Sequence, residues 1–241
     1  MSYYKRINSL LSIHLGHTNC FLLKTIDGYL LIDTSFPQYY DDFKKIINEN
    51  SINLMDIKYL FLTHHHDDHA GFAEQLKEDT NCTLIIHKDG IEPLTSGKMT
   101  SKNIPLNSGI KIIMSIFNTV KKRSFSIRPV TISNTDIIIE QEIDSVTLPK
   151  LGIDGIILHT IGHTQDSISI VCKNGNCFPG DICMNWFNVC GTHYRPIFIT
   201  DKTLVKNSWN ILIKNGAKIL YPSHGNPFKI EELKKSNDKY L

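Results

Sequence analysis

Histidine and aspartate side chains are concentrated in one short segment, which reads Thr63-His64-His65-His66-Asp67-Asp68-His69. A neutral imidazole offers one ring nitrogen to a metal ion and a carboxylate offers charged oxygens, so this mixture suits zinc, iron or manganese. Alternate side chains of an extended stretch point the same way, so His64 and His66 can converge on one ion. Asp68 and His69, at the turn into the next element, can then bind a second ion. The spacing predicts a site for two ions and is too specific for a chance histidine-rich loop.

The elements around this segment are typical of an α/β fold. The apolar run 57–62 is rich in strand-forming residues and ends directly at the histidine cluster. Residues 70–79 follow with a helical pattern, and residues 82–87 return as a strand. The cluster is therefore predicted to lie at the carboxyl end of a strand, where α/β sheets commonly place their polar sites.

The same alternation extends over most of the chain. Two strands at 20–23 and 29–32 flank a turn, and Pro37 precedes a helix with one apolar stripe. Further strands are predicted at 167–172, 177–180 and 218–221, with a helix at 201–215 that begins after Asp201 and ends near Gly216. We expect one domain over residues 1–241.

Residues 88–150 differ from the rest and are predicted to form an insertion or a cap. Their pattern indicates an amphipathic helix from Ile110 to Val120, followed by short strand-like runs at 127–132 and 136–140. At about 60 residues the segment is too short for a clear second domain.

Composition excludes several classes of protein. The 241 residues are 41% hydrophobic and 21% charged, with a net charge of +2, which favours neither disorder nor a nucleic-acid or anionic-membrane surface. No apolar run approaches the ~20 residues that span a bilayer, and the first residues lack the apolar core of a secretory signal. The six cysteines are too scattered for a disulfide framework. We therefore expect a cytoplasmic protein that binds a small molecule, with no nucleic-acid or membrane partner.

Four motifs together resemble the metallo-β-lactamase superfamily. They are His64-X-His66-X-Asp68-His69, Gly162-His163-Thr164, Gly180-Asp181 and Ser223-His224-Gly225, in that order. The resemblance spans most of the chain and implies a four-layer αββα sandwich with the metals at one edge. It places His64, His66 and His163 on the first metal and Asp68, His69 and His224 on the second. Asp181 would bridge both metals, which are expected to be zinc, with iron or manganese as alternatives.

The resemblance implies hydrolysis by a hydroxide that bridges the two metals. Two cations lower the pKa of a shared water towards ~7 and polarise the scissile bond, with Asp68 handling protons. The Asp68-His69 pair is similar to that of glyoxalase II, lactonases and RNA-processing nucleases, while 17 residues after His224 leave no room for the C-terminal domain of glyoxalase II. A small-molecule ester, lactone or thioester is the predicted substrate. The alternatives are a mononuclear iron oxidoreductase similar to persulfide dioxygenases and a phosphodiesterase or nuclease.

Other residues near the motifs have open roles. Asp33 is predicted either to orient a ligand histidine or to cap a turn. His65 and Asp67 should point away from the metals, and His159 stands where the family has the first histidine of His-Thr-Pro-Gly-His. Gln165-Asp166-Ser167 replaces the family's Pro-Gly-Ser and should alter the turn beside the site. Tyr194 is a candidate hydrogen-bond donor to a substrate oxygen, with an ordinary packed aromatic as the alternative.

Overall fold

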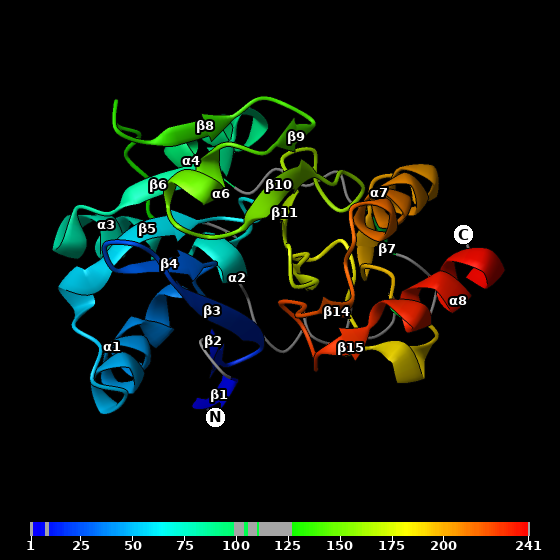
Figure 1. Ribbon diagram of the computed structural model, residues 1–241, viewed down its shortest axis with the longest axis horizontal. Helices are drawn as coiled ribbons and strands as arrows, with labels where there is room; N and C mark the ends of the chain where they lie inside the picture. The colour runs from blue at the N-terminus through cyan, green and yellow to red at the C-terminus, as the bar shows by residue number, and fades with distance from the viewer. Residues whose placement is uncertain (1, 8–9, 99–103, 106–109, 111–126, 241) are drawn as a thin grey trace.

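Two β-sheets packed face to face, with helices on both outer sides, form the fold (Figure 1). The computed structural model describes residues 2–7, 10–98, 104–105, 110 and 127–240. Within these ranges every helix is too short or too polar to cross a bilayer.

The first sheet carries the N-terminal half of the chain. Among the described residues its strands are, in spatial order, β1 (Tyr3–Ile7), β2 (Leu10–Leu15), β3 (Thr18–Lys24), β4 (Tyr29–Ile32), β5 (Ile57–Phe61), β6 (Thr83–His87) and β8 (Ile137–Ile139). Strands β1 to β4 pair antiparallel, whereas β4, β5, β6 and β8 run parallel. The carboxyl ends of β4 and β5 therefore lie side by side at one edge.

The second sheet carries the C-terminal half. Its described strands are, in order, β15 (Phe228–Lys229), β14 (Ile219–Leu220), β12 (Asn176–Phe178), β11 (Ile168–Cys172), β10 (Gly155–His159) and β9 (Ile143–Asp144). Only the β12–β14 pair is parallel among these described pairings. A separate short pair joins β7 (Ile104–Pro105) to β13 (Phe198–Ile199).

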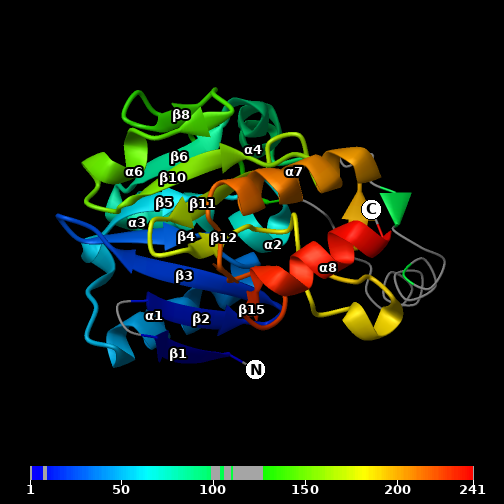
Figure 2. The same ribbon diagram turned by 45° about the vertical axis from the view of Figure 1, so that its right-hand side comes forward.

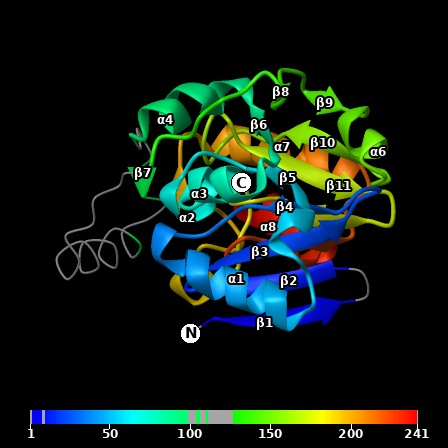
Figure 3. The same ribbon diagram turned by 90° about the vertical axis from the view of Figure 1, so that its left-hand side faces the viewer.

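Helices cover the outer face of each sheet. Figure 3 shows α1 (Tyr40–Glu49) and α3 (Ala73–Thr80) in front of the first sheet, and Figure 2 shows α7 (Lys202–Lys214) and α8 (Ile230–Tyr240) over the second. The shorter helices are α2 (Asp67–Ala70), α4 (Ile91–Ser96) and α6 (Thr147–Lys150), with 3-10 turns at Pro37–Tyr39, Leu54–Asp56, Lys88–Gly90 and Asn188–Cys190.

Three clusters of buried apolar side chains separate the four layers. Along β3 and β4, Phe21, Leu30 and Ile32 face the second sheet, whereas Leu22 and Leu31 face α1 and α3. This alternation is the period-two pattern of a strand buried on both faces. A third cluster, which includes Trp209, lies between the second sheet and its two helices. The predicted αββα sandwich is the observed architecture.

The element predictions differ from the structure mainly in residues 88–150. The strands around 20–32, the helix after Pro37 and the helix begun by Asp201 are confirmed. Residues 127–132 are not a strand, because Lys77 and Glu74 of α3 bind the Thr131 backbone in place of a neighbouring strand. The run 136–140 forms β8, which extends the first sheet beside β6. The helix predicted from Ile110 to Val120 lies outside the described residues except for Ile110, and an insertion or cap stays a prediction.

Candidate metal centre

The predicted ligands all follow strand ends, and the strands come from both sheets. His64 and His66 lie in the loop after β5, and Asp68 and His69 lie in α2, the short helix that this loop leads into. In the second sheet, His163 follows β10, Asp181 follows β12 and His224 follows β14. Because the two sheets face each other, these loops meet at one edge of the sandwich.

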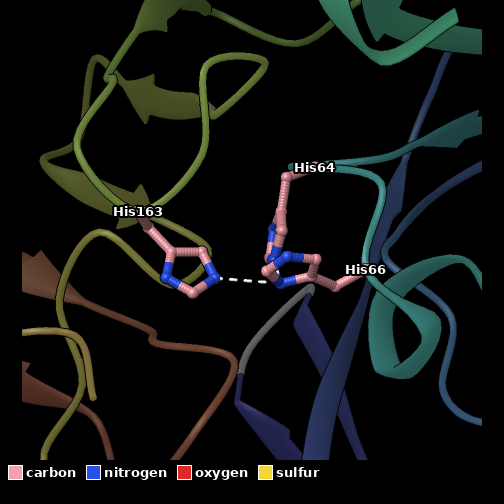
Figure 4. A group of neighbouring side chains, drawn as sticks. All are labelled: His64, His66 and His163. Carbon is pink, nitrogen blue, oxygen red and sulfur yellow. Dashed lines mark hydrogen bonds between the residues drawn. The ribbon is translucent and has the colours of Figure 1, made fainter. Parts of the chain in front are cut away.

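His64, His66 and His163 form the first group of converging side chains (Figure 4). The Nδ1 atom of His66 lies 3.0 Å from Nε2 of His64 and 3.0 Å from Nε2 of His163. Three nitrogens this close are spaced as ligands of one ion are, since a zinc–nitrogen bond is about 2.0–2.1 Å long. The group could hold one metal ion.

Asp68, His69 and His224 form the second group. The Oδ2 atom of Asp68 lies 3.1 Å from Nε2 of His224, and its Oδ1 atom lies 3.8 Å from Nε2 of His69. One carboxylate thus faces two imidazole nitrogens, a donor set that suits a divalent ion.

Asp181 lies between the two groups. Its Oδ2 atom is 3.4 Å from Nε2 of His224 and 3.7 Å from Nε2 of His163, so one oxygen faces both groups. Its Oδ1 atom is 3.5 Å from Nε2 of His69. This is the position expected of a carboxylate that bridges two ions.

Two buried polar atoms support the fit of metal ions to these residues. Among the described residues, His69 Nε2 and Asp181 Oδ1 have no hydrogen-bond partner, although both are shielded from solvent. Burying a polar atom without a partner costs free energy, so such atoms are rare unless something else satisfies them. A cation bound between these two atoms would satisfy both.

The first group is prepared for a cation because its imidazoles are neutral. Burial lowers the pKa of His64 and of His66 well below 6.5, and the neighbouring histidines lower both further. Burial also lowers the pKa of His163. A neutral imidazole has a free lone pair at neutral pH, so metal binding here displaces few protons.

The second group has the opposite electrostatics. Burial lowers the pKa of His224, but the charges of Asp181 and Asp68 outweigh burial and raise it to about 10. The same balance, with Asp33 added, raises the pKa of His69 well above 6.5. Burial raises the pKa of both Asp68 and Asp181, yet the facing imidazoles hold each below its usual range. Without metal, these groups pair as imidazolium and carboxylate.

Backbone carbonyls fix which ring nitrogen of two candidate ligand histidines faces the other side chains of the site. The Nδ1–H group of His163 donates to the carbonyl of Phe198 at 2.8 Å, and that of His224 donates to the carbonyl of His17 at 2.7 Å. Each bond fixes the tautomer and leaves Nε2 as the free ligand atom.

Asp33 orients His69 and ties the ligand loops together. Its Oδ2 atom accepts hydrogen bonds from His69 Nδ1 at 2.8 Å, Thr63 Oγ1 at 2.8 Å and Ser223 Oγ at 3.1 Å. Its Oδ1 atom accepts from the Thr63 backbone N–H at 2.7 Å, and the side chain is fully buried. Of the two predicted roles, the structure shows the orienting one.

Gly180 explains how Asp181 reaches the site. Its φ of +58° lies in the left-handed region, and a Cβ atom there would come within 2.7 Å of the Thr63 side chain. Only glycine avoids both the strain and the clash. The Gly180-Asp181 motif therefore lets the loop after β12 pack tightly on the loop after β5.

A buried pair that no sequence motif predicts joins two of the loops that carry candidate ligands. The Nδ1 atom of His65 lies 2.8 Å from Oδ1 of Asp166, and both side chains are almost fully buried. His65 thus points away from the metal groups, as predicted, and reaches the loop that follows His163. Aspartate in the position of the family's glycine was the signal for this contact.

Two other predicted residues lie away from the ligand groups. The ring of Tyr194 packs against Phe228 at 4.6 Å between centroids, in the cluster beside α7 and α8. This packing is that of the predicted alternative, an ordinary packed aromatic, and the substrate role of Tyr194 stays a prediction. His159 stacks on His87 and bonds through Nε2 to the carbonyl of Gln165, so it supports the loop after His163.

We expect the second group to bind metal more tightly as pH rises. His69 and His224 are protonated at pH 7 in the metal-free protein, so a cation must displace their protons. Each displaced proton makes affinity change about tenfold per pH unit, rising with pH. Calorimetric zinc titration at pH 7 and 8, in buffers of different ionisation enthalpy, counts the protons released. The first group should release few protons. Two equal zinc affinities that do not change with pH would contradict the protonation states assigned to the two groups.

Asp33→Asn should weaken metal binding at the second group by about 10–100-fold. The amide is uncharged, and its NH₂ would face one of the donors that now point at the carboxylate. Zinc affinity by competition with a chelating dye measures the loss. Asp136→Asn is the matched control, since Asp136 is also buried and accepts bonds from Lys77 and Leu84 far from the site. Equal zinc affinities of the two variants would sink the orienting role.

Comparison with known proteins agrees with this geometry. The family model of the metallo-beta-lactamase superfamily matches residues 14–224. The curated protein "Probable metallo-hydrolase MJ0888" from Methanocaldococcus jannaschii is 27% identical over 200 residues, which cover 81% of this chain and 82% of that protein.

Solved metallo-β-lactamases share the fold at low sequence identity. MIM-1 from Novosphingobium pentaromativorans is 17% identical, with a TM-score of 0.63 over 90% of this chain and 73% of its own. VMB-1 is 15% identical, with a TM-score of 0.64 over 98% of this chain and 95% of its own. The ligand groups, the αββα layers and the match over residues 14–224 lead to one conclusion: this chain belongs to the metallo-β-lactamase superfamily.

Proposed function

We propose that this metallo-hydrolase cleaves a small-molecule ester, lactone or thioester with two divalent metal ions, preferably zinc. The observation that carries the proposal is the pair of ligand groups, each with three converging donors, and Asp181 between them. A mononuclear centre needs one such group. The second group, with its own carboxylate and two imidazoles, supports a dinuclear one.

The bound cations would supply Lewis acidity, which activates water at neutral pH and polarises the scissile carbonyl. The chain supplies their positions and the handling of protons. His64, His66 and His163 would hold one cation, Asp68, His69 and His224 would hold the other, and Asp181 would contribute to both. No serine or cysteine nucleophile is required for this chemistry.

Asp68 is the residue best placed to move a proton. Its side chain is 21% exposed, compared with 7% for Asp181, so it borders both the ligand groups and solvent. In the metal-free chain its carboxylate is ionised at neutral pH, because the facing imidazoles of His69 and His224 hold its pKa below the usual range against the effect of burial. Its position at the edge of the ligand groups would let it accept a proton from water and deliver it to the leaving alcohol or thiol.

We expect zinc-loaded protein to hydrolyse members of an ester, lactone and thioester panel, and Asp68→Asn to lower kcat by about 10²–10⁴-fold. Asparagine cannot accept the proton. Asp67→Asn is the matched control, because it removes the adjacent carboxylate, which lies outside the ligand groups, and should leave kcat near the native value. Metal content is measured for the native protein and both variants. A lower kcat with unchanged metal content indicates a lost proton acceptor, whereas a lower metal content indicates a lost ion.

Two other outcomes would contradict the proposal. A single tightly bound iron, with oxygen consumption on a persulfide, would indicate a dioxygenase of the same superfamily. Cleavage of phosphodiesters without cleavage of any carbonyl ester would indicate a phosphodiesterase or nuclease.

A further inference from the structure

Trp186 is a large aromatic residue at the protein surface beside a metal ligand. Its side chain is 43% exposed, whereas the chain's other tryptophan, Trp209, is fully buried in the core. Its ring centroid lies 6.2 Å from that of His224, with the two planes 22° apart. An exposed indole retains unsatisfied apolar surface, which is typical of a place where a ligand binds.

The backbone around Trp186 is held firmly against the His224 loop. The side-chain amide of Asn185 donates to the carbonyl of Asn226 at 2.8 Å and accepts from its N–H at 2.9 Å. The Asn185 N–H also donates to the carbonyl of His224 at 3.3 Å. A Cβ atom at Gly225, whose φ is +107°, would lie 1.9 Å from the Asn185 side-chain oxygen. The glycine therefore allows the contact that places Trp186 beside the ligand.

His17 forms the second side of this aromatic surface. Its ring stacks on that of Trp186, with centroids 4.8 Å apart and planes 26° apart. Its backbone carbonyl accepts the hydrogen bond from His224 Nδ1. Both aromatic residues are thus fixed to the same metal ligand, one through its carbonyl and the other through the Asn185 contacts.

A pocket of about 230 Å³ lies at this surface, lined by His17, Trp186, Gly225 and Asn226, with Gly16, His14 and Tyr3 completing it. Pockets for drug-sized ligands measure roughly 300–1,000 Å³, so this one suits a single ring-sized group. The described residues that line it include no Asp, Glu, Lys or Arg. The pocket therefore favours a flat, uncharged group over a carboxylate or an ammonium.

We propose that Trp186 and His17 form a subsite for a planar, uncharged ring carried by the substrate, next to the metal group that contains His224. This inference rests on the proposed function, and it names the substrate class as aryl-substituted esters, lactones or thioesters. Trp186 selects the substrate by stacking, while the bond is cleaved at the metal centre.

Binding tests the subsite without any hydrolysis. Phenylacetamide and cyclohexylacetamide are uncharged probes of similar size, but only the first is planar. Saturation-transfer NMR with metal-free and zinc-loaded protein should show phenylacetamide binding up to about tenfold more tightly, the range that aromatic stacking supplies. Trp186→Ala should abolish this preference and Trp186→Phe should retain much of it. Tyr4→Ala removes an equally exposed aromatic, at 42%, outside this pocket and should leave the preference unchanged.

Kinetics then separate the subsite from the proposed function. With phenylacetyl and cyclohexylacetyl thioesters, Trp186→Ala should raise KM for the phenyl substrate about tenfold with little change in kcat. Aryl binding without any turnover would uphold the subsite and count against the proposed function. Turnover with equal binding of the planar and non-planar probes, or a preference that survives in Trp186→Ala, would overturn the subsite. Cleavage of a nucleobase-carrying phosphodiester alone, with KM raised by the same variant, would assign the planar ring to a nucleobase and overturn the aryl-ester class.

Discussion

The carboxylate of Asp33 is the point on which the ligand geometry depends. It follows β4, yet its two oxygens accept bonds from the loop after β5 and from Ser223, the residue before His224. Its backbone has a φ of +56°, a strained value for a residue with a side chain. The four hydrogen bonds hold the residue in this conformation and satisfy a carboxylate whose burial without partners would cost several kcal/mol. One buried charge thus sets the distance between loops of both sheets.

The fold and the convergence of the candidate ligands were largely predictable, because local sequence patterns encode both. Strand periodicity places β3, β4 and β5, and the histidine spacing after β5 follows directly from the sequence. The role of Asp33 was open, since its partners Thr63, His69 and Ser223 lie 30 to 190 positions away. Pairing across such separations depends on how the sheets pack, which no local pattern contains.

Tyr194 and Asp166 show that the sequence does not predict which way a loop side chain faces. For Tyr194 the sequence left a substrate contact and ordinary aromatic packing open, and the structure shows its ring packed on Phe228 beside α8. The sequence predicts that Asp166 alters the turn after His163. In the structure its side chain also pairs with the buried His65. Both outcomes depend on which way a loop residue faces. A strand's alternation fixes that direction, whereas a loop's sequence does not.

The metal ions would also connect the two sheets. His64, His66, Asp68 and His69 come from the first sheet, while His163, Asp181 and His224 come from the second. Between the sheets, an apolar cluster that includes Phe61, Ile168 and Phe178 stabilises their packing, but the hydrophobic effect does not specify their relative orientation. The charged side chains at the ligand edge specify the relative position of the sheets, because carboxylates and imidazoles from opposite sheets neutralise one another only in one arrangement. A cation bound there would replace the protons of the second group and would compensate the carboxylate charges in the same way. The packing that stabilises the metal-free chain is therefore the packing that forms the candidate metal centre.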